Sequence, residues 1–176
     1  LGDVYKRQLY GCSGKNNRSD SESAALGEIP TDKMVYRTNP TTGDRVSLLG
    51  YGCMRWPTRK RADGNGDEVD QEAVNELIDY AIAHGVNYFD TASPYHGGMS
   101  EKFCGKALAK YPRASYHLAS KLPGWLLKCD EDVSRIFNEQ LANCRTDYFD
   151  FYLVHSVHEG SWSNYVKYHA YDQLNE

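Results

Sequence analysis

The sequence lacks two features that would each point to a particular class of protein. No apolar run approaches the ~20 residues that a membrane-spanning helix needs. There is no basic excess either, since 20 Lys and Arg face 24 Asp and Glu and give a net charge of −4, whereas nucleic-acid-binding proteins usually carry a basic stripe. We therefore expect no membrane span and no nucleic-acid partner, and assign the protein to the cytoplasm by default.

Cysteine is too scattered for a metal or redox motif. The five cysteines include no C-x-x-C pair, so neither a zinc ribbon nor a thioredoxin-type site is indicated, and we expect reduced thiols. His155 and His158 lack a third nearby ligand. Residues 63–67 resemble the start of a calcium loop, but Glu68 and Val74 stand where glycine and glutamate belong. The sequence predicts no metal site.

The first 32 residues differ from the rest. Residues 12–23 are polar and rich in serine, without apolar periodicity, so residues 1–32 are predicted to be a disordered leader. The segment from Leu9 to Cys12 is similar to a bacterial lipoprotein signal, although charged residues precede it where such a signal has its apolar core. Lipoprotein-like export is therefore the alternative to a cytoplasmic location.

From residue 33 onward, short strands alternate with helices. A β-hairpin is expected over residues 35–48, a strand over 48–54 and a charged loop over 59–67. Further strands are expected over residues 86–90, 116–121 and 148–154, with helices over 74–82, 100–108 and 130–141. Gly85 should cap the first of these helices at its C-terminus, while Ser100 and Asp130 should cap the other two at their N-termini. The 148–154 strand is so apolar that both of its faces are expected to be buried.

This repeated βα order predicts a parallel sheet. A closed (β/α)8 TIM barrel needs ~250 residues, so residues 33–176 are predicted to be the N-terminal half of such a barrel, about four βα units preceded by a hairpin. A small open doubly wound sheet is the alternative, because periodicity alone does not separate the two. A half-barrel leaves strand edges uncovered, so we expect the C-terminal half to be missing from this chain.

Polar residues follow the ends of three predicted strands. Asp90, Lys121 and His155 each stand at a C-terminal end, and Tyr95 lies in the loop after Asp90. Active sites of parallel barrels form at this edge. Each residue alone is more often a cap, a solvated charge or a structural group, but together they indicate one site. Gly50-x-Gly52 has no third glycine before a helix, so it does not predict a Rossmann fold.

The residues around these positions resemble a known family. Residues 88–95 (YFDTASPY), 97–101 (GGMSE) and 147–155 (DYFDFYLVH) are similar to signatures of the aldo-keto reductases, and residues 50–57 (GYGCMRWP) resemble the first strand of a bacterial branch. Some members of that branch carry a C-terminal iron–sulfur segment. The resemblance implies an oxidoreductase with NADP as its coenzyme and NAD as the alternative, which transfers a hydride from the reduced coenzyme to an aldehyde, ketone or quinone carbonyl.

The resemblance also implies residue roles. Tyr95 would be the general acid that protonates the carbonyl oxygen, and Lys121 beside it would favour the phenolate. Asp90 would orient Lys121, and His155 would hydrogen-bond the small-molecule carbonyl substrate. Family members approach the nicotinamide at the end of the first strand, which here is Gly52, Cys53 and Met54; a packed strand end is the competing interpretation of these three.

Two other functions remain open. The first is a catalytically silent barrel fragment or a regulatory or binding subunit of the same fold. The second is an unrelated barrel hydrolase that uses Asp90 and another carboxylate. The combination of Asp90, Tyr95, Lys121 and His155 favours the reductase, because a silent site would be free to lose Lys121 or His155.

Overall fold

The computed structural model describes residues 32–175, which fall within one compact unit, Thr31–Glu176. The predicted leader at residues 1–32, apart from Asp32, and the Leu9–Cys12 segment lie outside the described residues. Among the described residues, no helix combines the length and the apolarity of a membrane span.

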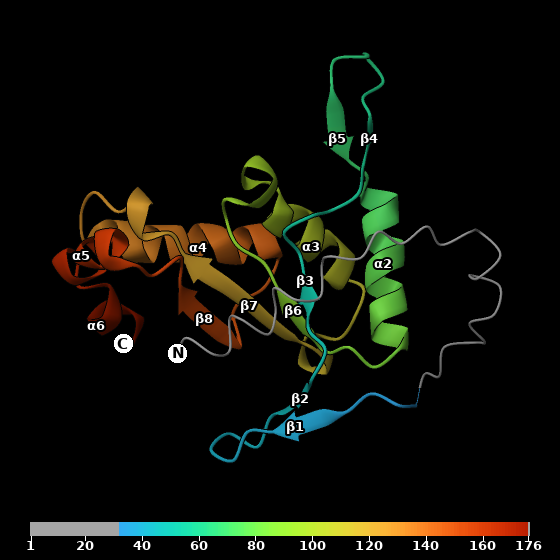
Figure 1. Cartoon of the computed structure of the whole chain (residues 1–176), viewed down its shortest axis with the longest axis horizontal. Helices are drawn as coiled ribbons and strands as arrows, with labels where there is room; N and C mark the ends of the chain where they lie inside the picture. The colour runs from blue at the N-terminus through green and yellow to red at the C-terminus, as the bar shows by residue number, and fades with distance from the viewer. Residues whose placement is uncertain (1–31, 176) are drawn as a thin grey trace, which may run out of the picture. The chain divides into compact units, whose positions relative to one another are not determined.

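The centre of the unit is a parallel sheet of four strands (Figure 1). They are β3 (Tyr51–Gly52), β6 (Tyr88–Asp90), β7 (His117–Leu122) and β8 (Phe151–Val154), in the spatial order β3-β6-β7-β8. Each strand pairs with the next strand of the sheet along the chain, with no reversal of direction across the described residues. An open doubly wound sheet reverses its strand order at a switch point. The order β3-β6-β7-β8 has no such reversal and therefore indicates the first part of a barrel.

Helices follow the strands as the βα repeat predicts. They are α2 (Gln71–Ala83), α3 (Ser100–Leu108), α4 (Glu131–Cys144), α5 (Glu159–Lys167) and α6 (Ala170–Leu174). Helix α3 packs against both α2 and α4, and α4 packs on β7. The α/β class and the partial (β/α)8 barrel are thus confirmed.

Two antiparallel hairpins lie outside the central sheet (Figure 1). The hairpin of β1 (Tyr36–Thr38) and β2 (Arg45–Ser47) confirms the prediction. The hairpin of β4 (Thr58–Lys60) and β5 (Asp67–Val69) does not, because this region was expected to be a loop. Its strands are joined by exposed cross-strand ion pairs, Arg59–Glu68 at 3.1 Å and Lys60–Asp67 at 2.7 Å, so they show no apolar alternation.

The predicted helix ends are only partly correct. Gly85, just beyond α2, has a φ of 85°, the left-handed conformation expected of a C-terminal glycine cap. Ser100 does not cap α3: it is the first helical residue, and its hydroxyl donates to the Cys53 carbonyl at 2.7 Å. Asp130 stands at the N-cap position of α4 without a side-chain hydrogen bond. Neither Ser100 nor Asp130 therefore caps its helix through its side chain.

The two strands at the edges of the central sheet are partly exposed, and β8 is more exposed than predicted. Strand β3 has only two residues, and Leu48 and Leu49 before it are 58% and 62% exposed. On β8, Leu153 is 41% exposed, which contradicts the expectation that both faces are buried. Within the described sheet, β8 has a neighbour only on the β7 side.

The contact between α3 and α4 depends on Gly105. A Cβ atom at this position would lie 2.6 Å from the backbone carbonyl of Cys144. We expect Gly105→Ala to lower the free energy of unfolding by about 2 kcal/mol, because overpacking outweighs the gain in helix propensity. Urea unfolding followed by circular dichroism measures this. Gly52→Ala is the matched stability control, since its methyl group would meet nothing within 4 Å; an equal loss for both variants would contradict the packing argument.

Candidate active site

The ends of β6 and β7 bring an acid and a base together. Asp90 ends β6 and lies opposite Ala119 of β7, two residues before Lys121. The Lys121 Nζ donates to Asp90 Oδ1 at 2.5 Å and to the Thr91 carbonyl at 2.7 Å. The Lys121 side chain is only 13% exposed. Two acceptors therefore hold a nearly buried ammonium group in one orientation.

Tyr95 approaches this pair from the loop after β6. It begins the short helix η3 (Tyr95–Gly98), and the Lys121 Nζ lies 5.1 Å from the centre of its ring. Its ring also meets His155 edge-on, with 5.8 Å between the ring centres. The Tyr95 hydroxyl makes no hydrogen bond to another described residue, so it is free to meet a carbonyl oxygen.

His155 follows β8 and faces Tyr95. Its backbone N–H extends the sheet by donating to the Leu122 carbonyl at 2.9 Å, and its ring lies 5.1 Å from that of Trp125. Burial and, to a smaller extent, the Lys121 charge lower the His155 pKa below its usual value, against an opposing effect of Asp90. The two lowering effects favour the neutral imidazole. Its Nδ1 is buried without a partner among the described residues.

The loop that carries Tyr95 is tied to the end of β3. His96 has a φ of 51°, which is uncommon for a residue with a side chain. Its Nε2 accepts from the backbone N–H of Trp56 at 2.6 Å, and the Trp56 indole donates to Ser100 Oγ at 3.0 Å. These contacts tie His96 of η3 and Ser100 at the start of α3 to Trp56, and so restrain the loop that carries Tyr95.

Of the three residues predicted to border the coenzyme, Gly52 and Cys53 lie beside Asp90, and Met54 follows them in the chain. Gly52 pairs with Asp90 across the sheet, and the Cys53 N–H donates to the Asp90 carbonyl at 2.8 Å. Cys53 is fully buried, whereas Met54 is 52% exposed. A Cβ atom at Gly52 would meet no other atom within 4 Å, so the space beside this residue is open. The buried Cys53 fits the competing interpretation, a packed strand end.

Several supporting residues were missed at the level of sequence. The Thr91 carbonyl holds Lys121, and Trp125, in the short helix η5 (Gly124–Leu126), packs on His155. Neither has a recognisable sequence signal, because one acts through its backbone and the other through a contact across the sheet. Among residues 32–175, no group of three His, Cys, Asp or Glu could hold a metal ion.

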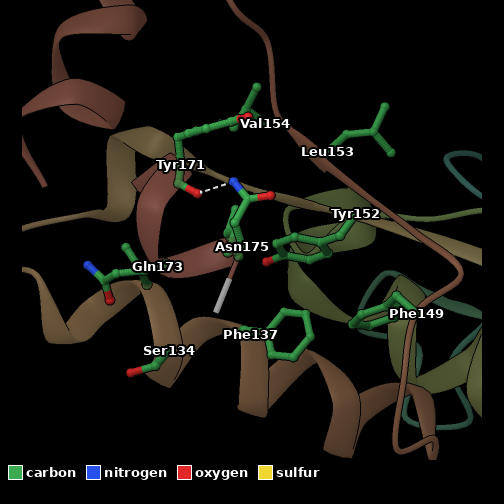
Figure 2. Close-up of a pocket in the computed structure, with 11 residues that line it drawn as sticks. Ser134, Phe137, Phe149, Tyr152, Leu153, Val154, Tyr171, Gln173 and Asn175 are labelled. Carbon is green, nitrogen blue, oxygen red and sulfur yellow. Dashed lines mark hydrogen bonds between the residues drawn. The ribbon is translucent and has the colours of Figure 1, made fainter. Parts of the chain in front are cut away.

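A separate pocket is lined by a different set of residues (Figure 2). It has a volume of about 750 Å³ and lies between α4, β8 and α6. Phe137, Phe149 and Tyr152 lie along it in Figure 2. None of the four candidate catalytic residues lines it, and its lining carries no charged group. It is an apolar groove and not the site of proton transfer.

The comparisons with known proteins agree with the geometry. The profile of the Aldo/keto reductase family matches residues 48–163. The chain is 32% identical to L-galactose dehydrogenase of Arabidopsis thaliana over 140 residues, which cover 76% of this chain and 42% of that protein.

Solved structures agree as well. An aldo-keto reductase from Bacillus halodurans superimposes with a TM-score of 0.55 at 30% identity, covering 68% of this chain and 40% of that one. Another, from Klebsiella pneumoniae in complex with NADPH, shares the fold with a TM-score of 0.56 at 24% identity, covering 76% and 45%. The chain thus spans less than half of each of these proteins, and the profile match covers most of its described residues. The chain belongs to the aldo/keto reductase family.

Proposed function

We propose that this chain carries the catalytic residues of a nicotinamide-dependent carbonyl reductase, with Tyr95 as the general acid. One observation carries the proposal: a nearly buried ammonium group, Lys121, lies between the Asp90 carboxylate and the Tyr95 ring. Residues 33–176 would supply this part of a (β/α)8 barrel, whose remaining half completes the substrate pocket.

The proposed roles follow from the contacts. As hydride reaches the carbonyl carbon, negative charge develops on the carbonyl oxygen, and the Tyr95 hydroxyl donates its proton there. The Lys121 ammonium stabilises the phenolate that is left behind, because opposite charges nearby favour the charged form. Asp90 keeps that ammonium group charged and oriented through the 2.5 Å contact. The neutral His155 can donate a hydrogen bond to the same carbonyl oxygen and fix its direction.

The coenzyme is proposed to be NADP, with NAD as the alternative. A nicotinamide coenzyme supplies the hydride when bound. Gly52, Cys53 and Met54 would border its ring, because the open space at Gly52 lies beside Asp90. The NADPH complex of the Klebsiella pneumoniae reductase of the same fold supports this choice. The substrate class is an aldehyde, ketone or quinone.

The proposal is tested by turnover of the whole protein that contains these 176 residues. Oxidation of NADPH and of NADH is followed by absorbance with a panel of small aldehydes, ketones and quinones. Carbonyl-dependent oxidation of either coenzyme is the expected result. Coenzyme binding without turnover across the panel would contradict the proposal and support a regulatory or binding subunit of the same fold.

A further inference from the structure

A buried carboxylate lies behind the candidate active site. Glu101 is the second residue of α3 and is fully buried. A charged residue is seldom buried to this extent unless it is paired or well hydrogen-bonded. Glu101 has no direct ion pair among the described residues, so its burial calls for another explanation.

Three hydrogen-bond donors surround Glu101. Ser120 Oγ and Gln140 Nε2 each donate at 2.7 Å, and Asn143 Nδ2 donates at 3.4 Å. The Tyr152 hydroxyl donates to Gln140 Oε1 and so turns the Gln140 amide group toward the carboxylate. An ionised carboxylate only accepts hydrogen bonds, so this set of donors selects the ionised form.

The electrostatic contributions at Glu101 oppose one another. Burial has the largest effect and raises the pKa above its usual value, while the hydrogen bonds from Ser120, Gln140 and Asn143, and to a smaller extent the Lys121 charge, offset part of that increase. The Lys121 ammonium group therefore interacts electrostatically with the buried Glu101 carboxylate. The three donors supply the hydrogen bonds that the ionised carboxylate needs in this buried position.

The same network reaches the backbone that carries Lys121. Gln140 Nε2 also donates to the Lys121 carbonyl at 3.1 Å and lies 3.0 Å from Ser120 Oγ. Successive side chains of a strand point to opposite faces, so Ser120 meets Glu101 on one face of β7 while Lys121 meets Asp90 on the other. Glu101 thereby fixes the strand at the point where Lys121 projects.

The residue before Glu101 is tied to the other side of the site. Ser100 Oγ donates to the Cys53 carbonyl and lies 3.1 Å from Thr91 Oγ1. The Thr91 carbonyl in turn accepts from Lys121. The first turn of α3 therefore connects the end of β3, the residue after β6 and the end of β7.

We propose that Glu101 is a positioning residue for Lys121, acting as a buried negative charge behind β7 and as the acceptor that orders Ser120 and Gln140. This inference rests on the proposed function, since it concerns the same ammonium group. It assigns Glu101 no contact with substrate or coenzyme.

The test replaces Glu101 with glutamine in the whole protein. We expect Glu101→Gln to lower kcat by about 10- to 100-fold, because small displacements of a catalytic group have effects of this size, with the KM for the coenzyme unchanged. The alkaline limb of the kcat/KM profile should move to lower pH, because one negative charge near Lys121 and the phenol is lost. Glu101→Asp, which keeps the charge, should retain the wild-type limb.

Two further variants separate position from folding. Tyr152→Phe removes only the hydroxyl that orients Gln140, and it should lower kcat with an unchanged coenzyme KM. If Glu101→Gln fails to fold, this variant tests the inference in its place. Glu139→Gln makes the same charge change at an exposed position of α4 paired with Arg135 and should leave kcat and the pH profile unchanged. An active wild type whose kcat and alkaline limb do not respond to Glu101→Gln or Tyr152→Phe overturns the inference, whereas an inactive wild type overturns the proposed function.

Discussion

Phenylalanine in place of Tyr95 is expected to lower kcat for carbonyl reduction by about 10²–10⁴-fold, the range for loss of a general acid. The substitution removes one oxygen atom and keeps the ring that contacts Lys121 and His155. The Tyr95 hydroxyl makes no hydrogen bond to another described residue, so the fold should not depend on it. Steady-state kinetics and the coenzyme dissociation constant measure the effect, and coenzyme affinity should not change.

Tyr171→Phe is the matched control for this variant. Tyr171 is 75% exposed and lies on α6, away from the ends of β6 and β7. Its loss of a hydroxyl should leave kcat unchanged. If Tyr95→Phe were as active as Tyr171→Phe, another group would have to donate the proton, and Tyr95 would lose its assigned role.

Alanine in place of Arg113 is expected to give the largest loss of stability. Arg113, in the short helix η4 (Arg113–Ser115), donates to Asp150 at 2.6 Å, to Thr146 at 2.9 Å, and to the carbonyls of Tyr116 and Tyr148 at 3.0 Å. The partners of the ion pair are only 19% and 18% exposed. This cluster lies near the start of β7 and β8, where barrels are stabilised, and not at the edge where they catalyse.

Removing Arg113 leaves the mostly buried Asp150 carboxylate without its guanidinium partner, with only the Leu118 N–H and His117 Nδ1 beside it among the described residues. We therefore expect Arg113→Ala to lower the free energy of unfolding by about 3 kcal/mol, measured by urea unfolding. Arg113→Lys keeps the charge but loses the planar fork, and should fall between alanine and wild type. The exposed pair Arg59–Glu68, at 53% and 40% exposure, is the control: Arg59→Ala should cost less than about 1 kcal/mol. Equal losses at Arg59 and Arg113 would show that burial of the pair contributes nothing.

Local periodicity predicted the regular elements that pack on the core. The apolar stripe of Val74, Ile78 and Ala81 is buried on α2, because a helix that covers a sheet must present one apolar face to it. The β4–β5 hairpin escaped this reasoning. Its order comes from ion pairs between strands and not from an apolar face, and a charged, glycine-rich stretch is equally typical of a loop.

The helix ends show a second limit of local reasoning. Ser100 has the residue type and the place of an N-terminal cap, yet its hydroxyl binds the Cys53 carbonyl from another strand. At α4 the side chain that accepts backbone N–H groups is Asp132, from Lys128 and Cys129, and not the predicted Asp130. Competition between local and distant acceptors is decided only when the chain is packed.

The order of strands and helices, and the presence of Asp90, Tyr95, Lys121 and His155 after strand ends, are properties of the sequence alone. The spacing of apolar residues predicts where each strand and helix lies. The C-terminal ends of parallel strands lie at one edge of the sheet, so residues that follow those ends are expected to lie near one another. The pairing of Asp90 with Lys121 was implied by the family resemblance, whereas the tertiary structure alone decided that Lys121 also binds the Thr91 carbonyl and that Glu101 is buried among donors from β7 and α4. These contacts join residues about 20 to 40 positions apart, and a local pattern carries no information about register and packing across such a distance.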